Sequence, residues 1–175
     1  MDFSIKTFDA KSTLATAKAG CIAVGVFEGK QLSTAARLLD SSGALTAAVK
    51  AGDISGKAGT TLLLRGVAGI AAERILLVGL GKENTVSQKE FGSALRALAS
   101  TFANIGANDA LVALPLDTVK EASLSWAINS AVQAICQHAY RFDELKSKPD
   151  KHRSTQDRMR HKSQLRVCRT QRRDE

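Results

Sequence analysis

The sequence lacks any apolar run that approaches the roughly 20 residues needed to span a bilayer. It also lacks a secretion signal, because Asp2 follows the initiator methionine and no apolar stretch precedes a cleavage site in residues 1–12. We therefore expect a cytoplasmic protein that has no membrane partner.

Cysteine is scarce as well. The chain has three, Cys21, Cys136 and Cys168, which lie far apart and in neither CxxC nor any other metal-binding spacing. This pattern excludes a disulfide framework and predicts free thiols in a reducing cytoplasm.

The side chains of common active sites are almost absent. His138 is the only histidine before residue 150, and it has no acidic or sulfur side chain three or four positions away. A polar or helix-dipole role is therefore favoured over catalysis. Asp143 and Glu144 are adjacent, so on a regular element they would point apart rather than form a catalytic pair. With no GxSxG motif and no cluster of metal ligands, the sequence predicts no catalytic, cofactor-binding or metal-binding residue in this chain.

What is present is ordinary for a soluble globular protein. The chain has 175 residues, of which 44% are hydrophobic and 24% charged. This length predicts one domain of about 150 residues with an appendage.

The most informative stretch is ERILLVGLGK, residues 73–82, in which a short apolar run stops at glycine. Such a run is typical of a strand buried on both faces of a sheet that helices cover. Apolar residues then recur at helical spacing, and Ser87 with Glu90 fits a capping box. The stripe expected to dock on the sheet is Phe91, Leu95, Leu98, Phe102 and Ile105.

The remaining pattern predicts a mixed sheet flanked by helices. Strands 60–65 and 73–80 are separated by too few residues for a crossover helix, so they should form an antiparallel hairpin. The other expected strands are 3–8, 21–27 and 110–114, and the other expected helices are 34–39 (capped by Ser33 or Thr34), 44–51 (with Gly52 after it) and 117–140.

Two glycine-rich segments invite comparison with phosphate-binding loops. Residues 79–82 fit neither GxGxxG, because Asn84 occupies the third glycine position, nor the P-loop, because Glu83 follows Gly-Lys. A tight turn at a strand end is the favoured interpretation. Residues 52–59, which include Lys57, could cradle an anion, but an exposed loop is favoured there too.

Positive charge is concentrated at the C-terminal end. Residues 151–175 hold nine of the 25 basic residues and three of the 17 acidic ones, which leaves a net charge of +2 on residues 1–150. The tail has four apolar residues without periodicity, so we expect it to be disordered. It is either an evolved element that binds nucleic acid weakly and without sequence preference through its arginines, or an out-of-frame or otherwise non-native segment. No aromatic residue is interleaved for base stacking, and the abrupt change of composition favours the second interpretation.

Three segments together resemble the N-terminal domain of the leucyl aminopeptidase (cytosol aminopeptidase) family. They are residues 73–82, the helix start at 87–91, and YRFDELKSK at 140–148. The resemblance covers residues 1–148 and implies an α/β domain that is similar to macro domains. Residues 149–175 would then be the disordered basic tail.

The resemblance also implies that catalysis belongs to a different domain of the family's enzymes. In that family a C-terminal domain holds two divalent metals, zinc or manganese, through Lys, Asp and Glu side chains that include a stretch NTDAEGR, and removes N-terminal amino acids. Nothing in this chain resembles those motifs, so we expect a non-catalytic domain that is inactive alone. The pattern departs from the family at about Asp150, for which a frameshift near codons 149–152 is the simplest explanation.

Family members assemble as hexamers, and some bacterial members bind DNA. Aminopeptidase subunits are thus possible partners. Two alternatives stay open: a small nucleic-acid-binding protein that acts through its basic tail, and a macro-like binder of ADP-ribose or a nucleotide at the loops around residues 79–82.

Overall fold

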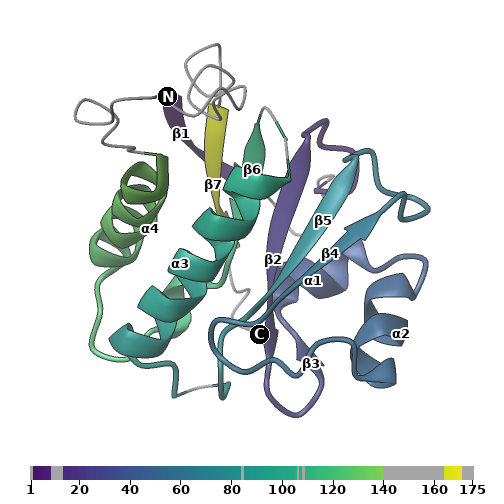
Figure 1. Cartoon of the computed structure of the whole chain (residues 1–175), viewed down its shortest axis with the longest axis horizontal. Coiled ribbons are helices and arrows are strands. Elements are labelled where there is room, and N and C mark those ends of the chain that lie inside the picture. The colour runs from purple at the N-terminus through teal and green to yellow at the C-terminus, as the bar shows by residue number, and fades with distance from the viewer. Residues whose placement is uncertain are drawn as a thin grey trace, which may run out of the picture.

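The computed structural model describes residues 2–8, 14–83, 85–105, 107, 109–139 and 164–170. In these parts one twisted sheet lies between two layers of helices (Figure 1). The strands are β1 (Asp2–Phe8), β2 (Cys21–Phe27), β3 (Gln31–Leu32), β4 (Thr61–Arg65), β5 (Arg74–Gly79), β6 (Ala110–Ala113) and β7 (Gln164–Thr170). The helices are α1 (Thr34–Leu39), α2 (Ala44–Ala51), α3 (Gln88–Asn104) and α4 (Leu124–Ala139), with a 3-10 turn, η1 (Leu116–Thr118).

The sheet is mixed, as the sequence predicts. Its strand order is β1-β7-β6-β2-β5-β4, and the short β3 pairs with the end of β2. Every pairing from β1 across to β5 is parallel. Only β3 and β4 run antiparallel to their neighbours, and β4 pairs with β5 from Thr61↔Val78 to Arg65↔Arg74. The predicted hairpin is therefore confirmed.

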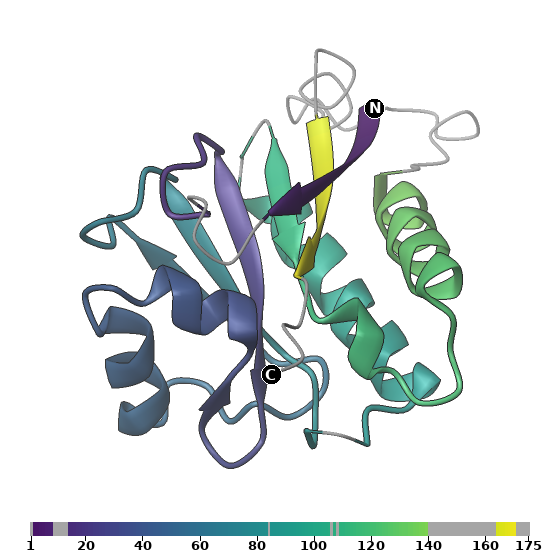
Figure 2. The same cartoon turned by 180° about the vertical axis from the view of Figure 1, so that it is seen from behind.

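The core lies on both faces of the sheet because successive side chains of a strand point to opposite faces. On β2, Ile22 and Val24 pack towards α1 and α2, whereas Cys21 and Ala23 pack towards α3 and α4. All seven residues of β2 are buried. Figure 1 shows α3 and α4 over one face, and Figure 2 shows α1 and α2 over the other.

Helix α3 docks through the predicted stripe. Four of its members, Phe91, Leu95, Leu98 and Phe102, are 5% exposed or less, and Ile105 is half-buried at the helix end. The capping box is also confirmed. Ser87 Oγ accepts from the Glu90 backbone N–H at 3.2 Å, and Glu90 Oε2 accepts from the Ser87 backbone N–H at 2.8 Å.

The predicted helix over residues 117–140 is wrong in its first turns. The chain forms η1, Val119 then makes a parallel bridge to Val86, and Glu121 has a φ of 57°, which no right-handed helix adopts. Helix α4 begins only at Leu124, where Ser123 Oγ accepts from the Trp126 N–H at 3.1 Å. Trp126 packs on Phe91 of α3 with ring centroids 6.2 Å apart.

The expectation of a disordered tail needs correction for seven residues. Gln164–Thr170 form β7, which is inserted between β1 and β6 with registers Asp2↔Gln164 and Ala110↔Leu165. The sequence did not indicate this strand, because strands inside a parallel sheet normally read as continuous apolar runs and QLRVCRT contains Gln164, Arg166 and Arg169. The rest of the proposed tail, residues 149–163 and 171–175, lies outside the described residues.

Candidate functional site

The two glycine-rich segments meet at the carboxyl end of β5, where they are hydrogen-bonded to each other. The Gly81 N–H donates to the Gly56 carbonyl oxygen at 2.9 Å, and the Gly59 N–H donates to the Gly79 carbonyl oxygen at 3.2 Å. The Gly79 and Leu80 N–H groups donate to other carbonyl oxygens, of Thr60 and Val26. Three consecutive amides, at residues 79–81, are therefore committed to the protein itself.

Glycine is needed here because backbones approach closely. A Cβ at Gly79 would overlap the Lys57 carbonyl oxygen, and a Cβ at Gly56 would overlap the backbone of Phe27. Phosphate-binding loops need N–H groups that point at the ligand. Because these amides already donate internally, the geometry argues against a nucleotide at residues 79–82 and supports the tight-turn interpretation.

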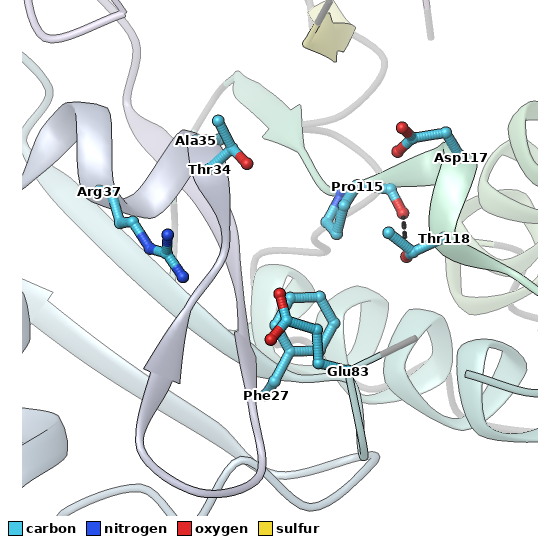
Figure 3. Close-up of a pocket in the computed structure, with 8 residues that line it drawn as sticks. All are labelled: Phe27, Thr34, Ala35, Arg37, Glu83, Pro115, Asp117 and Thr118. Atoms are coloured by element: carbon cyan, nitrogen blue, oxygen red, sulfur yellow. Dashed lines mark hydrogen bonds between the residues drawn. The ribbon is translucent and has the colours of Figure 1, made fainter. Parts of the chain in front are cut away.

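A pocket lies beside this junction, at the carboxyl ends of the parallel strands (Figure 3). In open α/β sheets this edge is where ligands usually bind, because the connections leaving neighbouring strands diverge there. The walls come from four places: the end of β2, the start of α1, the loop after β5, and the turn after β6. The lining residues are Phe27, Thr34, Ala35, Arg37, Glu83, Pro115, Asp117 and Thr118.

Local structure holds the lining in place. Ser33 Oγ accepts from the Ala36 N–H at 3.3 Å, which caps α1 and presents Thr34 and Arg37 at the pocket. Thr118 Oγ1 donates to the Pro115 carbonyl oxygen at 2.9 Å, which closes the turn that carries Asp117 (Figure 3).

The charges of the pocket are mixed. Arg37 Nε donates to the Leu32 carbonyl oxygen at 3.0 Å, so one edge of the guanidinium is fixed on the protein. Figure 3 shows Arg37 and Asp117 on opposite sides of the pocket, with Glu83 between them. No Arg37 nitrogen lies within 4.0 Å of a Glu83 carboxylate oxygen. The pocket lining thus holds one cationic and two anionic side chains. Arg37 and Glu83 do not form a close ion pair with each other.

The pocket volume limits its ligand. At about 60 Å³ it is far smaller than the roughly 300–1,000 Å³ of typical drug-sized ligand sites. This argues against ADP-ribose or a whole nucleotide as its occupant. Sequence reasoning missed the pocket, because its charged residues, Arg37, Glu83 and Asp117, fit no motif. Only their positions after strand ends gave a signal.

The other sequence candidates lie partly or wholly outside the described residues. His138 lies near the end of α4, and its side chain falls outside the described part. Asp143 and Glu144 are also outside it. Among the residues that the structure describes, no group of three or more His, Cys, Asp or Glu side chains could hold a metal ion.

Among the described residues, two ionisable groups have shifted pKa values, and both shifts have a structural explanation. Burial raises the pKa of the Cys21 thiol from 9.0 to about 12, although the nearby charge of Arg74 opposes this. Hydrogen bonds from the backbone and side chain of Ser87 lower the pKa of Glu90, which is the capping-box carboxylate. Neither group lines the pocket. Cys21 is a buried free thiol and Cys136 an exposed one, and Cys168 lies in β7.

Comparison with known proteins shows the family. Residues 23–149 match the profile described as "Cytosol aminopeptidase family, N-terminal domain". A probable cytosol aminopeptidase of Herminiimonas arsenicoxydans is 59% identical over 150 residues, which cover 86% of this chain and 30% of that protein. The chain thus spans about a third of the length of the curated relatives it matches.

Solved structures agree on the fold. A mutant of tomato leucine aminopeptidase matches 95% of this chain and 32% of its own, with a TM-score of 0.64 and 25% identity. The macrodomain of Mycobacterium tuberculosis DarG matches 77% of this chain with a TM-score of 0.59 and 12% identity, which shows a shared macro-like fold. No helix in the described ranges is long and apolar enough to cross a membrane. The sequence match, the mixed sheet and these structural neighbours together show that the chain belongs to the cytosol aminopeptidase family, whose N-terminal domain it carries.

Proposed function

We propose that residues 1–148 are an accessory, non-catalytic domain of a cytoplasmic metallo-aminopeptidase and that this polypeptide alone does not hydrolyse peptides. The observation that carries the proposal is the match of residues 23–149 to the family's N-terminal domain. The part of the chain that the structure describes contains no group of three or more His, Cys, Asp or Glu side chains that could hold a metal ion.

The chemistry would then belong to a different part of the enzyme. In a two-metal site, metal ions polarise the substrate carbonyl and activate water. The resemblance assigns manganese or zinc to the catalytic domain, through Lys, Asp and Glu side chains. The present domain would add surface for assembly with other aminopeptidase subunits.

An activity and metal assay tests the proposal. The purified chain is dialysed, its zinc and manganese are measured, and release of leucine from a leucyl amide is followed with added Mn²⁺. We expect neither bound metal nor turnover, whereas the full-length Herminiimonas arsenicoxydans relative, as the positive control, should show both. Turnover by this chain, or retention of about one metal ion or more per chain, would overturn the proposal.

Assembly is tested separately by native mass spectrometry. The chain is mixed with subunits of the full-length relative during refolding. Incorporation into a hexamer would support an assembly role, and exclusion at every mixing ratio would contradict it.

Nucleic-acid binding through the tail is the second candidate, and the charge of residues 151–175 favours it. Deleting the whole tail would also remove β7, so a cleaner variant replaces only the basic residues outside that strand with glutamine. These are Lys151, Arg153, Arg158, Arg160, Lys162, Arg172 and Arg173. If the tail binds nucleic acid, this variant should lose binding, and binding by the parent chain should weaken steeply with salt. Equal binding of nucleic acid by the variant and the parent chain would exclude the basic residues of the tail as the binding site.

The origin of residues 149–175 is a separate proposal. Translation of the other two frames of the coding DNA beyond codon 150 should recover metal-binding motifs if the segment is out of frame.

A further inference from the structure

Opposite charges face each other across the pocket at the carboxyl end of the sheet. Arg37 lies on one side, Asp117 on the other and Glu83 between them (Figure 3). We propose that this pocket binds a small zwitterion, a free α-amino acid with a minimal side chain such as glycine or alanine. The inference does not depend on the proposed function, because it involves no peptidase chemistry.

The α-carboxylate would bind at Arg37. Its Nε is held by the Leu32 carbonyl oxygen at 3.0 Å, which fixes the plane of the guanidinium and leaves the Nη donors for a ligand. A guanidinium binds a carboxylate through two parallel hydrogen bonds, so a fixed plane favours this group over a spherical anion. Thr34, one turn earlier on α1, adds a hydroxyl to the same wall.

The α-ammonium would bind at the acidic side. An ammonium group has three donors and no acceptor, and the Glu83 carboxylate offers an acceptor in the lining, to which Asp117 adds a second negative charge. A divalent metal fits less well, because the only two acidic side chains of the lining face an arginine.

Size and wall polarity restrict the rest of the ligand. One water-sized group needs about 10–15 Å³ of cavity volume. The pocket of about 60 Å³ therefore holds about four to six groups of that size. That matches the heavy atoms of glycine or alanine. Phe27, Ala35 and Pro115 supply apolar surface for the Cα and a methyl group. A leucine side chain would exceed the space.

The affinity should be modest. Arg37, Glu83 and Asp117 are all exposed, and charges in contact with water interact weakly. Dissociation constants of the order of 1 mM are therefore expected, which suits titration followed by ¹H–¹⁵N NMR of the full chain.

The titration uses four probes. Glycine and alanine should shift the amides of Phe27, Arg37 and Thr118. Glycinamide, which lacks the carboxylate, and N-acetylglycine, which lacks the ammonium, should bind at least tenfold more weakly. Equal binding of glycinamide and glycine would overturn the proposal, because the site would then be selective for a cation alone.

Matched variants locate the site. Arg37→Gln and Glu83→Gln should each weaken glycine binding at least tenfold. Two control variants remove the same charges away from the pocket: Arg96→Gln on the exposed side of α3 and Asp53→Asn in the loop after α2. Both should leave glycine binding unchanged. Loss of binding in all four variants would show a general charge effect and contradict the assignment, as would shifts confined to amides outside the pocket.

One further probe distinguishes ligand classes. ADP-ribose should produce no shifts at the pocket amides. If ADP-ribose bound saturably and Arg37→Gln abolished this binding, the ligand of the pocket would be a nucleotide, and the amino-acid proposal would be wrong. Neither result bears on peptidase activity, so the two proposals fail independently.

Discussion

The Gly81 amide donates to the Gly56 carbonyl oxygen at 2.9 Å, and the Gly81 carbonyl oxygen accepts from the Glu28 amide at 2.8 Å. Gly81 therefore ties together three segments, namely the end of β2, the loop before β4 and the end of β5. Gly79, the last residue of β5, lacks a Cβ and so leaves room for the carbonyl oxygen of Lys57. This junction forms the edge of the sheet on which the pocket is built.

Replacement of Gly79 by alanine should destabilise the protein. The new Cβ would overlap the Lys57 carbonyl oxygen and Thr60 Oγ1, and backbone cannot move aside as a flexible side chain can. We expect a loss of about 2–3 kcal/mol in the free energy of unfolding, measured by urea denaturation. The control is Gly92→Ala in α3, where a Cβ would meet nothing closer than Arg96 Nη1 at 3.8 Å. This change should stabilise by about 0.5–1 kcal/mol. Equal effects of the two substitutions would contradict the packing argument.

The capping box of α3 should make stability depend on acid pH. Because the pKa of Glu90 is lowered in the folded state by hydrogen bonds from Ser87, its contribution is present above the ordinary value of 4.5 and is lost as pH falls below it. Relative to the parent chain, Glu90→Gln should be less stable at pH 7, and this difference should shrink as the pH drops below 4.5. Urea denaturation at several pH values measures it.

Ser87→Ala provides the matching variant. Removing the cap hydroxyl should cost about 1 kcal/mol at pH 7. It should also shrink the pH-dependent difference seen with Glu90→Gln, because the hydroxyl donates to the Glu90 carboxylate at 2.8 Å. An unchanged difference in the Ser87→Ala background would show that the hydroxyl does not lower the pKa of Glu90 and would leave the backbone N–H of residue 87 as the cause.

Cys21 should be chemically inert in the folded protein. The thiolate is the nucleophile, and a pKa raised to about 12 by burial leaves about one thiol in ten thousand ionised at pH 8. Iodoacetamide followed by peptide mass spectrometry should modify the exposed Cys136 and spare Cys21 until urea unfolds the chain. Alkylation of both at equal rates under native conditions would contradict the burial of Cys21.

The same thiol should weaken the fold in alkali. Its folded pKa exceeds the unfolded value of 9.0, so the protonated form is favoured in the folded state, and stability is full below pH 9 and declines as pH rises towards 12. A Cys21→Ala variant should lack this part of the decline. Parallel stability curves for the two proteins between pH 8 and pH 10.5 would show that Cys21 ionisation does not contribute to the loss of stability in alkali.

The order of β1 should depend on its pairing with β7. Among the strands that the structure describes, β1 pairs only with β7, and β7 reaches the rest of the sheet through the three pairs from Ala110↔Leu165 to Val112↔Val167. Val167→Pro removes a ladder donor in an interior strand, so hydrogen exchange should accelerate in β1 as well as β7, while β5 stays protected. Val167→Ala keeps the N–H and should leave β1 protected. Unchanged exchange of the β1 amides in the proline variant would contradict the pairing.

Much of this fold follows from local pattern. The unbroken apolar runs at β2 and β5 and the stripe on α3 identify the core, because burial on both faces leaves no place for polar residues. The short separation of the two strands predicted the hairpin of β4 and β5. Cap chemistry indicated Ser33 or Thr34 at the start of α1, where the structure has Ser33, and the end of α2, where Gly52 takes a φ of 93°.

The rest depends on long-range contacts that no local pattern contains. The bridge of Val119 to Val86 interrupts an otherwise helical sequence, and β7 is defined only by the strands on either side of it. The pocket escaped prediction for the same reason. Glu83 and Asp117 follow the parallel strands β5 and β6, and Arg37 lies in α1, which follows the antiparallel pair of β2 and β3. Only the assembled sheet brings these three segments to one edge.

The pairing of β1 with β7 also affects the order in which the protein is made. Asp2 and its partner Gln164 are 162 positions apart in the chain (164 − 2), so β1 leaves the ribosome well before β7. Domains generally fold as units during synthesis, and an unpaired strand is open to chaperones and to misassembly until its partner arrives. The N-terminal strand should thus be the last element to reach its place in the nascent protein.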